Sequence, residues 1–289
     1  MTILQSELLC LLKKFINFLQ DHNIRYIAAY GTVLGAARHN GFIPWDDDID
    51  IYMWREDYNL LLQLRKELLR SGCDVISIED KGYYLPFAKV VDPNTTVWEM
   101  KKIPFIIGNF IDIFPLDRFD CTDTEIIEMQ KKSKALFFDY QATVSNENLI
   151  DAVRYLFTGH KTSMIRAIRQ VVYRGRMRED KLYKFCEYEK NYVGLAGYKC
   201  ACVNMQVGLI LKSSWFDETL NLPFEDFYVT VPADYDDYLT RLYGDWRTPP
   251  PQNKQKAKHD EIKYYMNLKE KLTLEEVKLR IKKGERLVL

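Results

Sequence analysis

The sequence predicts an α+β fold, in which a mixed β-sheet has flanking helices and a helical insert. Three observations predict it. A buried strand over residues 24–30 runs into the pair Gly31-Thr32, and a short helix and loop then lead to a strand with acidic residues as far as Asp50. From residue 122 the composition becomes that of amphipathic helices, and strand-like segments return after them. Such a chain packs its helices onto a mixed sheet.

The elements before the insert follow from two kinds of periodicity. Residues 3–20 and 55–70 place leucine and aromatic side chains at helical spacing, and Gly72 is the expected stop of the second helix. Short apolar runs bounded by turn residues predict strands instead. These strands are expected at 74–78, 85–91, 95–99 and 105–114.

The elements from residue 122 onward begin with Thr122-Asp123-Thr124-Glu125, a pattern typical of a helix capping box. Helices are expected at 123–142, 147–157, 162–174 and 178–192. Strands at 201–207 and 227–231 and helices at 235–243 and 274–284 complete the chain. We therefore expect a catalytic core over 1–121, a helical insert over 122–200, and a C-terminal part over 201–289 that completes the core and the substrate site.

Charge and hydropathy narrow the function classes. The chain has 289 residues, with 41 Lys and Arg against 41 Asp and Glu, so its formal net charge is zero. That balance argues against a nucleic-acid partner bound through its phosphates, although a nucleotide substrate needs only a local patch of charge. Neither a signal-peptide pattern nor a run of about 18 apolar residues occurs, so we expect a cytoplasmic protein. A basic run from Arg166 to Arg178 either meets a phosphorylated or membrane-borne acceptor or forms a solvated helix face. Action at the inner face of the membrane, with peripheral membrane contact, is the further expectation.

The most informative stretch is residues 46–50, which read DDDID. On a strand, Asp48 and Asp50 point to the same side, and such carboxylates repel each other unless a cation lies between them. Oxygen ligands suit Mg²⁺, which keeps room for phosphate oxygens. Asp112 lies between isoleucines on a later strand and could supply a third ligand. The first two acids either shape the turn or take part directly. A solvated acidic loop is the plainer alternative, and the flanking isoleucines argue against it.

Several other residues could bind a phosphorylated substrate. Gly31 and Thr32 lie where a helix start lets backbone N–H groups approach a phosphate. Lys89, among apolar neighbours, either extends to solvent or meets an anion, and Arg38 could assist it. Trp246 belongs to a rigid segment that could stack a base or wall a choline-sized cation, or else pack as a surface loop. The substrate-binding candidates are Gly31, Thr32, Arg38, Lys89, Trp246 and His259.

Residues 31–50, which read GTVLGAARHNGFIPWDDDID, closely resemble the LicD family. The blocks REDY, IDIFPLD and YGDW at 55–58, 111–117 and 243–246 resemble it too, in matching order. The resemblance extends from about residue 24 to 260, and the helical insert carries no matching motif. His259 is followed by Asp260 where the family pattern leads us to expect a second histidine. That histidine either binds phosphate or is solvated.

The resemblance implies a nucleotidyltransferase-like fold and a distant relation to fukutin-related protein. It implies transfer of phosphocholine, or a related phospho-alcohol, from a CDP-activated donor such as CDP-choline to a sugar hydroxyl, with release of CMP. The acceptor would be a bacterial surface glycan, such as lipopolysaccharide or teichoic acid, or its lipid-linked precursor. By the same resemblance, Asp48 and Asp50 hold Mg²⁺ or Mn²⁺, Asp112 is the third acid and the base, and Gly31 and Thr32 lie against the donor phosphates.

Two other functions remain open at this point. A sugar-nucleotide-dependent glycosyltransferase also holds a metal and a diphosphate with Asp-x-Asp, but it usually follows a longer parallel α/β half than the segment before Gly31 supplies. A non-catalytic interaction protein could keep the same fold. Binding of divalent ions separates that last alternative from the enzymes.

Overall fold

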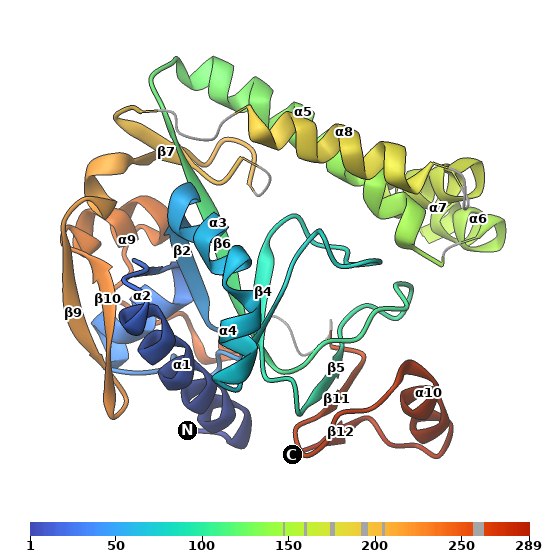
Figure 1. The fold of residues 1–289 in the computed structure, drawn as a ribbon, viewed down its shortest axis with the longest axis horizontal. Helices are drawn as coiled ribbons and strands as arrows, with labels where there is room; N and C mark the ends of the chain where they lie inside the picture. The colour runs from blue at the N-terminus through green and yellow to red at the C-terminus, as the bar shows by residue number, and fades with distance from the viewer. Residues whose placement is uncertain (147, 159–160, 174–176, 192–195, 204–205, 257–262) are drawn as a thin grey trace.

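A computed structural model describes residues 1–146, 148–158, 161–173, 177–191, 196–203, 206–256 and 263–289. Within these ranges the centre of the fold is a seven-stranded sheet in the order β1-β2-β6-β4-β3, with β7 on β6 and β8 on β7 (Figure 1). Strand β2 runs parallel to β6, and the other pairs are antiparallel. The expected α+β class with a mixed sheet is therefore confirmed. The strands are β1 (Ile27–Ala28), β2 (Asp50–Trp54), β3 (Asp74–Ile76), β4 (Ala88–Val91), β6 (Phe110–Phe119), β7 (Lys199–Ala201) and β8 (Leu211–Lys212).

Several expected strands have shifted bounds, and the one expected at 201–207 is β7, which ends at Ala201. The strand expected at 24–30 is only β1, because helix α2 (Tyr30–His39) already begins at Tyr30. The strand expected at 105–114 is β6, which begins later and continues to Phe119. Its first half pairs with β2 and β4, and its last residues pair with β7. This long strand therefore joins the two parts of the sheet.

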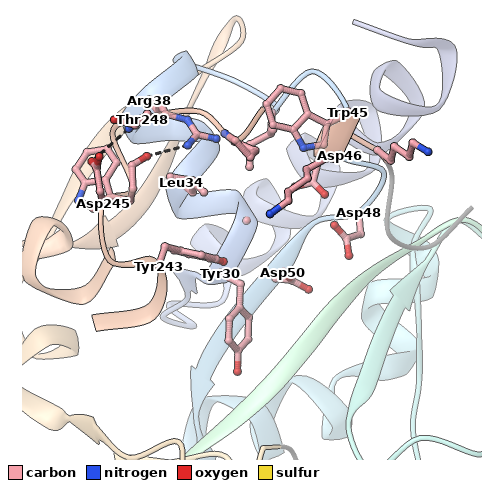
Figure 2. A pocket seen from close by; sticks show the side chains of 16 residues that line it. Tyr30, Leu34, Arg38, Trp45, Asp46, Asp48, Asp50, Tyr243, Asp245 and Thr248 are labelled. Carbon is pink, nitrogen blue, oxygen red and sulfur yellow. Dashed lines mark hydrogen bonds between the residues drawn. The ribbon is translucent and has the colours of Figure 1, made fainter. Parts of the chain in front are cut away.

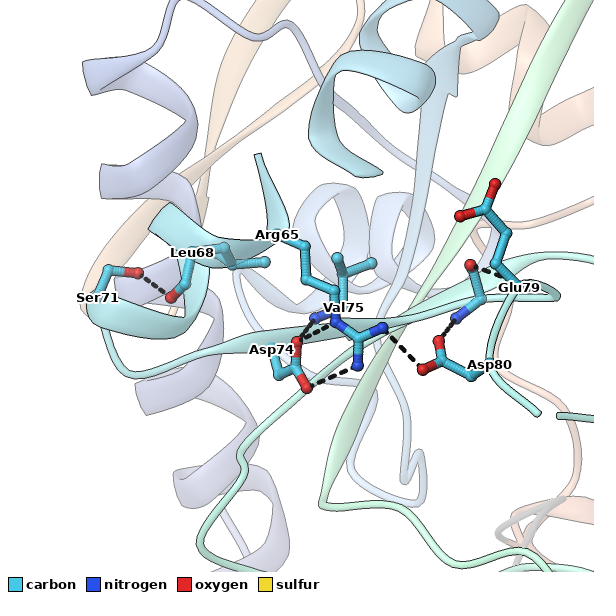
Figure 3. Close-up of polar contacts among 8 residues, drawn as sticks. Arg65, Leu68, Ser71, Asp74, Val75, Glu79 and Asp80 are labelled. Carbon is cyan, nitrogen blue, oxygen red and sulfur yellow. Dashed lines mark hydrogen bonds and ion pairs between the residues drawn. The ribbon is translucent and has the colours of Figure 1, made fainter. Parts of the chain in front are cut away.

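The helices before the insert are close to the predicted ones. Helix α1 (Ile3–Asp21) begins with a capping box between Thr2 and Gln5, and its leucine and phenylalanine stripe is buried as expected. The helix expected at 55–70 is two, α3 (Arg55–Gln63) and α4 (Arg65–Arg70). Figure 3 shows how Arg65 fixes α4 to the sheet edge. Its guanidinium donates to Asp74 at 2.7 and 3.0 Å and to Asp80 at 2.7 Å.

The predicted helical insert is observed as helices α5 (Asp123–Val144), α6 (Leu149–Thr158), α7 (Lys161–Tyr173) and α8 (Arg178–Lys190). Helix α5 begins with the expected capping box of Thr122 and Glu125. Helices α5 and α8 run side by side away from the sheet, and α6 and α7 lie at their far end (Figure 1). The division of the chain into three domains stays a prediction.

A buried ion cluster ties this helical arm to the sheet. Arg55 at the start of α3 donates to both carboxylate oxygens of Asp117 on β6, at 2.8 and 2.6 Å. Its guanidinium also lies 3.6 Å from the carboxylate of Glu189 on α8. Burial lowers the pKa of Arg55, but the charge of Asp117 more than offsets this and raises it. Asp117 therefore has a structural partner in the core.

The C-terminal part forms two further layers. The hairpin β9 (Thr219–Phe224) and β10 (Phe227–Pro232) precedes helix α9 (Tyr235–Tyr243), which matches the expected helix. The small sheet β12-β11-β5 contains β5 (Thr96–Trp98), β11 (Tyr265–Asn267) and β12 (Leu287–Val288), next to helix α10 (Leu274–Lys282). The short 3₁₀ helices are η1 (Ser213–Phe216) and η2 (Gln252–Lys254). None of the described helices has both the length and the apolar character needed to cross a bilayer.

Candidate active site

Three charged side chains form a row across the central sheet. On parallel strands β2 and β6, Asp50 is the register partner of Asp112, and on the other side of β6, Asp112 is the partner of Lys89 on β4. Laterally paired residues of a sheet project from the same face. The prediction that Asp112 lies on a strand beside the acidic motif is confirmed.

Lys89 is almost completely buried and lies between two carboxylates. Its ammonium nitrogen is 2.7 Å from Asp112 Oδ1 and 3.3 Å from Glu99 Oε1, and it lies 3.2 Å from the centre of the Phe110 ring. Burial lowers the pKa of Lys89, but the charges of Asp112 and Glu99 more than offset this and raise it. Tyr84 donates a short hydrogen bond to the other oxygen of Glu99. Lys89 is thus a buried cation that compensates acidic neighbours.

Burial raises the pKa of Asp112 to about 6, and the charge of Lys89 counters that effect. The carboxyl therefore titrates close to neutral pH, where a catalytic base is most effective. Its Oδ1 atom lies 2.7 Å from the Lys89 ammonium, which is the cation that faces this carboxylate in the structure.

Thr32 positions the start of the acidic strand. Its hydroxyl accepts a hydrogen bond from the Asp50 backbone N–H at 2.9 Å, and the Ala29 N–H donates to the Asp50 carbonyl at 2.9 Å. The Thr32 side chain is buried, so in this structure it contacts the strand. The first turn of α2 and the first residue of β2 are therefore held together.

Gly31 is required by the close approach of an acid. A Cβ atom added to Gly31 would lie 2.6 Å from Asp46 Oδ2, closer than real Cβ contacts allow. The preceding residue, Tyr30, has a φ of 42°, which a non-glycine residue adopts at a cost of about 1–3 kcal/mol. Tyr238 stabilises this conformation, because its hydroxyl accepts a hydrogen bond from the Tyr30 N–H at 3.0 Å. Such strain is common at functional sites.

These residues surround a cavity of about 620 Å³ (Figure 2). One wall carries Trp45, Asp46, Asp48 and Asp50, and the opposite wall carries Asp245 at the end of α9. The volume is in the range of small-molecule sites. The cavity is lined by Tyr30, Gly31, Leu34, Arg38, Ile43, Trp45, Asp46, Asp48, Asp50, Tyr243, Asp245, Trp246, Thr248, Pro250, Lys254 and Lys256.

The predicted site residues are only partly brought together. Five of them, Gly31, Arg38, Asp48, Asp50 and Trp246, line this cavity. Thr32, Lys89 and Asp112 are not among its lining residues and make the contacts given above. His259 lies outside the described residues. The role of each of them in binding or catalysis stays a prediction.

The described part of the chain places one group of acids close enough to share a cation. The carboxylate oxygens of Asp46, Asp47 and Asp48 all lie within 4.8 Å of one another. Asp47 also accepts from Lys263 at 3.0 Å. Hard carboxylate oxygens match Mg²⁺ or Mn²⁺, so the donor set fits the predicted ion. The predicted ligand set of Asp48, Asp50 and Asp112 shares only Asp48 with this group of described residues. The position of Asp46 in the same acidic run was the sequence signal for it.

Arg38 and Trp246 hold the opposite wall together. The Arg38 guanidinium donates to the Trp246 carbonyl at 2.8 Å and to His39 Nε2 at 2.9 Å, and burial lowers the pKa of Arg38 (Figure 2). The Trp246 indole N–H donates to Asp236 at 3.0 Å, and its ring is packed against Tyr235. Both side chains therefore have structural contacts in addition to their place at the cavity.

The sequence is similar to a known protein family and to proteins of known activity. Residues 23–161 match the family model described as "LicD/FKTN/FKRP, nucleotidyltransferase domain". This range of the chain is a LicD-family domain. The chain is 27% identical over 286 residues to the lipopolysaccharide cholinephosphotransferase LicD of Haemophilus influenzae, covering 92% of this chain and 99% of that protein. It is 42% identical over 50 residues to the human ribitol 5-phosphate transferase FKRP, covering 17% of this chain and 10% of that protein.

The LicD family match covers the row of Asp50, Asp112 and Lys89 but not the whole site. Residues from α9 to η2, beyond the matched range, form the opposite wall of the cavity. Gln255 and Lys256, which follow η2, line a second cavity of about 670 Å³, which also shares Trp45 and Asp46 with the first. Its remaining lining includes Tyr264 and Arg286, whose guanidinium lies 4.4 Å from the Tyr264 ring centre. Two cavities of similar size therefore meet at the acidic loop.

Proposed function

We propose that this LicD-family protein is a phosphotransferase that moves phosphocholine, or a related phospho-alcohol, from a CDP-activated donor to a sugar hydroxyl and releases CMP. The acceptor is a bacterial surface glycan, such as lipopolysaccharide or teichoic acid, or its lipid-linked precursor. The observation that carries the proposal is the similarity to the Haemophilus influenzae cholinephosphotransferase along nearly the whole of both chains. The acid-lined cavity supports it.

In the proposed reaction, the acceptor hydroxyl attacks the phosphorus that bears the alcohol. A new phosphorus–oxygen bond forms to the sugar, and the bond from that phosphorus to the bridging oxygen of CMP breaks. The electron pair leaves with CMP. Asp112 takes the hydroxyl proton, for which a pKa of about 6 is well suited. Lys89 keeps that carboxylate ionised and oriented rather than touching the phosphate.

Asp46, Asp48 and Asp50 line the cavity, and Asp46 and Asp48 belong to the group of close carboxylates. In our proposal these three residues would hold Mg²⁺ or Mn²⁺. When bound, the ion neutralises charge on the donor diphosphate. Gly31 leaves room for the Asp46 carboxylate, and Thr32 fixes the backbone of Asp50. These two residues therefore act on the acids, and Gly31 also lines the cavity that the donor would occupy.

The two cavities correspond to the two substrates. In our proposal the donor occupies the first cavity, because the acids line it, and the acceptor reaches them from the second. Tyr264 offers an apolar face to a sugar ring, and Arg286 and Lys256 offer cations to its negatively charged substituents. Trp45 and Asp46 form the shared wall where the groups would meet. The expected place of action, in the cytoplasm or at the inner face of the membrane, stays a prediction.

The two alternatives have less support. A sugar-nucleotide glycosyltransferase would need a donor site that the family relation does not suggest, because the matched family model is a nucleotidyltransferase domain. A non-catalytic protein would not need an acid-lined cavity of substrate size. Thermal-shift screening with UDP- and GDP-sugars against CDP-alcohols distinguishes these possibilities.

The test is release of CMP by the purified protein from CDP-choline, with Mg²⁺ and a lipopolysaccharide or teichoic acid precursor. We expect CMP to form only with both acceptor and divalent ion present, and to stop on addition of EDTA. CDP-ethanolamine and CDP-ribitol are run in parallel. Absence of CMP with every CDP-alcohol would reject the assignment.

A further inference from the structure

The helical hairpin of α6 and α7 leaves large apolar side chains uncovered. On α6, Ile150 is 80% and Phe157 is 82% exposed, and on α7, Val172 is 69% exposed. Val153 and Leu156, also on α6, are 54% and 63% exposed. Isolated exposed apolar residues are ordinary, but a concentration of them on one hairpin marks an interaction surface.

Helical geometry gathers these side chains on one side of each helix. Ile150, Val153 and Phe157 are spaced i, i+3 and i+7, and so are Ile165, Ile168 and Val172 on α7. The sides that pack inward carry other residues: Ala152 and Ala167 are buried. The exposed faces are therefore not needed for the hairpin's own packing.

The hairpin also has a net positive charge within a neutral chain. Helices α6 and α7 contain four basic residues, Arg154, Lys161, Arg166 and Arg169, against one acid, Asp151. That acid already pairs with Lys102 at 2.7 Å. In the sequence, three more arginines follow α7 before Glu179. Exposed apolar residues on helices with a net positive charge are the composition of helices that lie in the interface of an anionic bilayer.

The position of the hairpin agrees with such a role. It lies at the far end of α5 and α8, away from the central sheet (Figure 1). Arg169 donates to Asp139 on α5 at 2.6 Å, so α7 is fixed to the arm. If the hairpin binds a membrane, the acid-lined cavity in the part of the molecule that contains the central sheet remains accessible.

We propose that the α6–α7 hairpin is a docking surface for an anionic lipid bilayer. The apolar faces enter the boundary between headgroups and acyl chains, and the net positive charge of the two helices attracts lipid phosphates. This inference does not depend on which group is transferred or on which acceptor receives it.

The test is co-sedimentation of the full chain with vesicles of phosphatidylcholine alone or mixed with phosphatidylglycerol. We expect binding to the mixed vesicles that weakens, without vanishing, at high salt. The double variant Ile150→Ser/Phe157→Ser should reduce the partition coefficient by about tenfold or more. Leu279→Ser, on the 57% exposed leucine of α10, is the matched control and should bind as the wild type does.

Two outcomes overturn the proposal. One is equal binding of the wild type and the double variant to the mixed vesicles, with both folded by circular dichroism. The other is failure of the wild type to bind any vesicle. If sedimentation velocity without lipid then shows a dimer that the double variant loses, the hairpin is an interface between copies of this chain.

Discussion

Asp50 and Asp112 are register partners on the adjacent parallel strands β2 and β6, although 62 residues separate them in the chain. This pairing joins Asp50, which lines the cavity, to the ion pair of Asp112 and Lys89 on the neighbouring strands. A proton taken up by Asp112 on β6 therefore lies next to Asp50 on β2, which would help to hold the cation. Protonation of Asp112 and cation binding at Asp50 are thus expected to influence each other in the proposed transfer.

Substitution of Asp50, which lines the cavity, should reduce activity without destabilising the fold. Asp50→Asn keeps the shape of the side chain and the backbone hydrogen bond to Thr32, but it removes the charge that would hold a divalent ion. We expect CMP release to fall by at least about 100-fold, with an unchanged melting temperature. Asp245→Asn, on the opposite wall of the cavity, is the control and should have a smaller effect. Undiminished turnover in the Asp50 variant would remove this residue from the site.

The pKa of Asp112 can be measured by carbon NMR of its carboxyl group in metal-free protein. Burial raises it to about 6, and Lys89 counters that effect, so Lys89→Met should raise the pKa further. Lys102→Met, at a remote ion pair, should leave it unchanged. A lower pKa in the Lys89 variant would contradict the assigned contact.

The same shift has a consequence for stability. The folded-state pKa lies above the ordinary carboxyl value of 3.8, so the folded protein keeps a proton that the unfolded chain releases between about pH 4 and 6. The contribution of Asp112 to stability is thus lost as the pH rises through this window. Denaturation of wild type and Asp112→Asn across pH 4 to 7 measures it: the difference between them should grow in favour of the variant as the pH rises. No pH dependence of that difference would argue against the shift.

Gly31 should be needed for activity more than for stability. In Gly31→Ala the new methyl group displaces the Asp46 carboxylate, while alanine suits the first turn of a helix better than glycine does. We expect CMP release to fall by about tenfold or more, with an unchanged or higher melting temperature. A fully active Gly31→Ala variant would show that the position of Asp46 is unimportant.

The ion pair of Arg55 and Asp117 should matter for stability. Asp117→Asn leaves a buried guanidinium without its main counter-charge, so the free energy of unfolding should fall by about 3–5 kcal/mol. Asp217→Asn removes the partner of Arg118 in a more exposed pair and should cost less than about 1 kcal/mol. Urea denaturation of the two variants gives the comparison, and equal losses would contradict it.

Arg286 should act on the acceptor alone. Arg286→Ala removes a cation from the second cavity, so it should raise the KM for an anionic glycan acceptor several-fold and leave the KM for the CDP-alcohol unchanged. Lys278→Ala, an exposed cation on α10 that is absent from both cavity linings, is the control. A rise in the KM for the CDP-alcohol instead would indicate that the donor, and not the acceptor, occupies the second cavity.

Much of the fold follows from local patterns. Helices α1, α5 and α9 agree closely with expectation because their periodicity and their stops are encoded within a few turns. The break at Leu64 was not predicted, because the apolar spacing continues through it. Strands β9 and β11 were missed: β9 contains Asn221 and Pro223 and is half exposed, and β11 is three residues long. Their pairing partners, not their own composition, make them strands.

The candidate site shows the same limit. The acidic run indicated Asp48 and Asp50 as candidate site residues, and the position of an acid between isoleucines indicated Asp112. No local pattern could show that Lys89 would neutralise Asp112, because that contact depends on the register of β4 and β6. The second cavity is likewise built from segments at both ends of the chain.

The most direct test of the central claim is mass spectrometry of the acceptor glycan after incubation with CDP-choline and Mg²⁺. We predict that the glycan gains one phosphocholine for each CMP formed, and that Asp50→Asn protein gives neither product. CMP formed without modification of the glycan, or a sugar transferred from a nucleotide-sugar instead, would contradict the account.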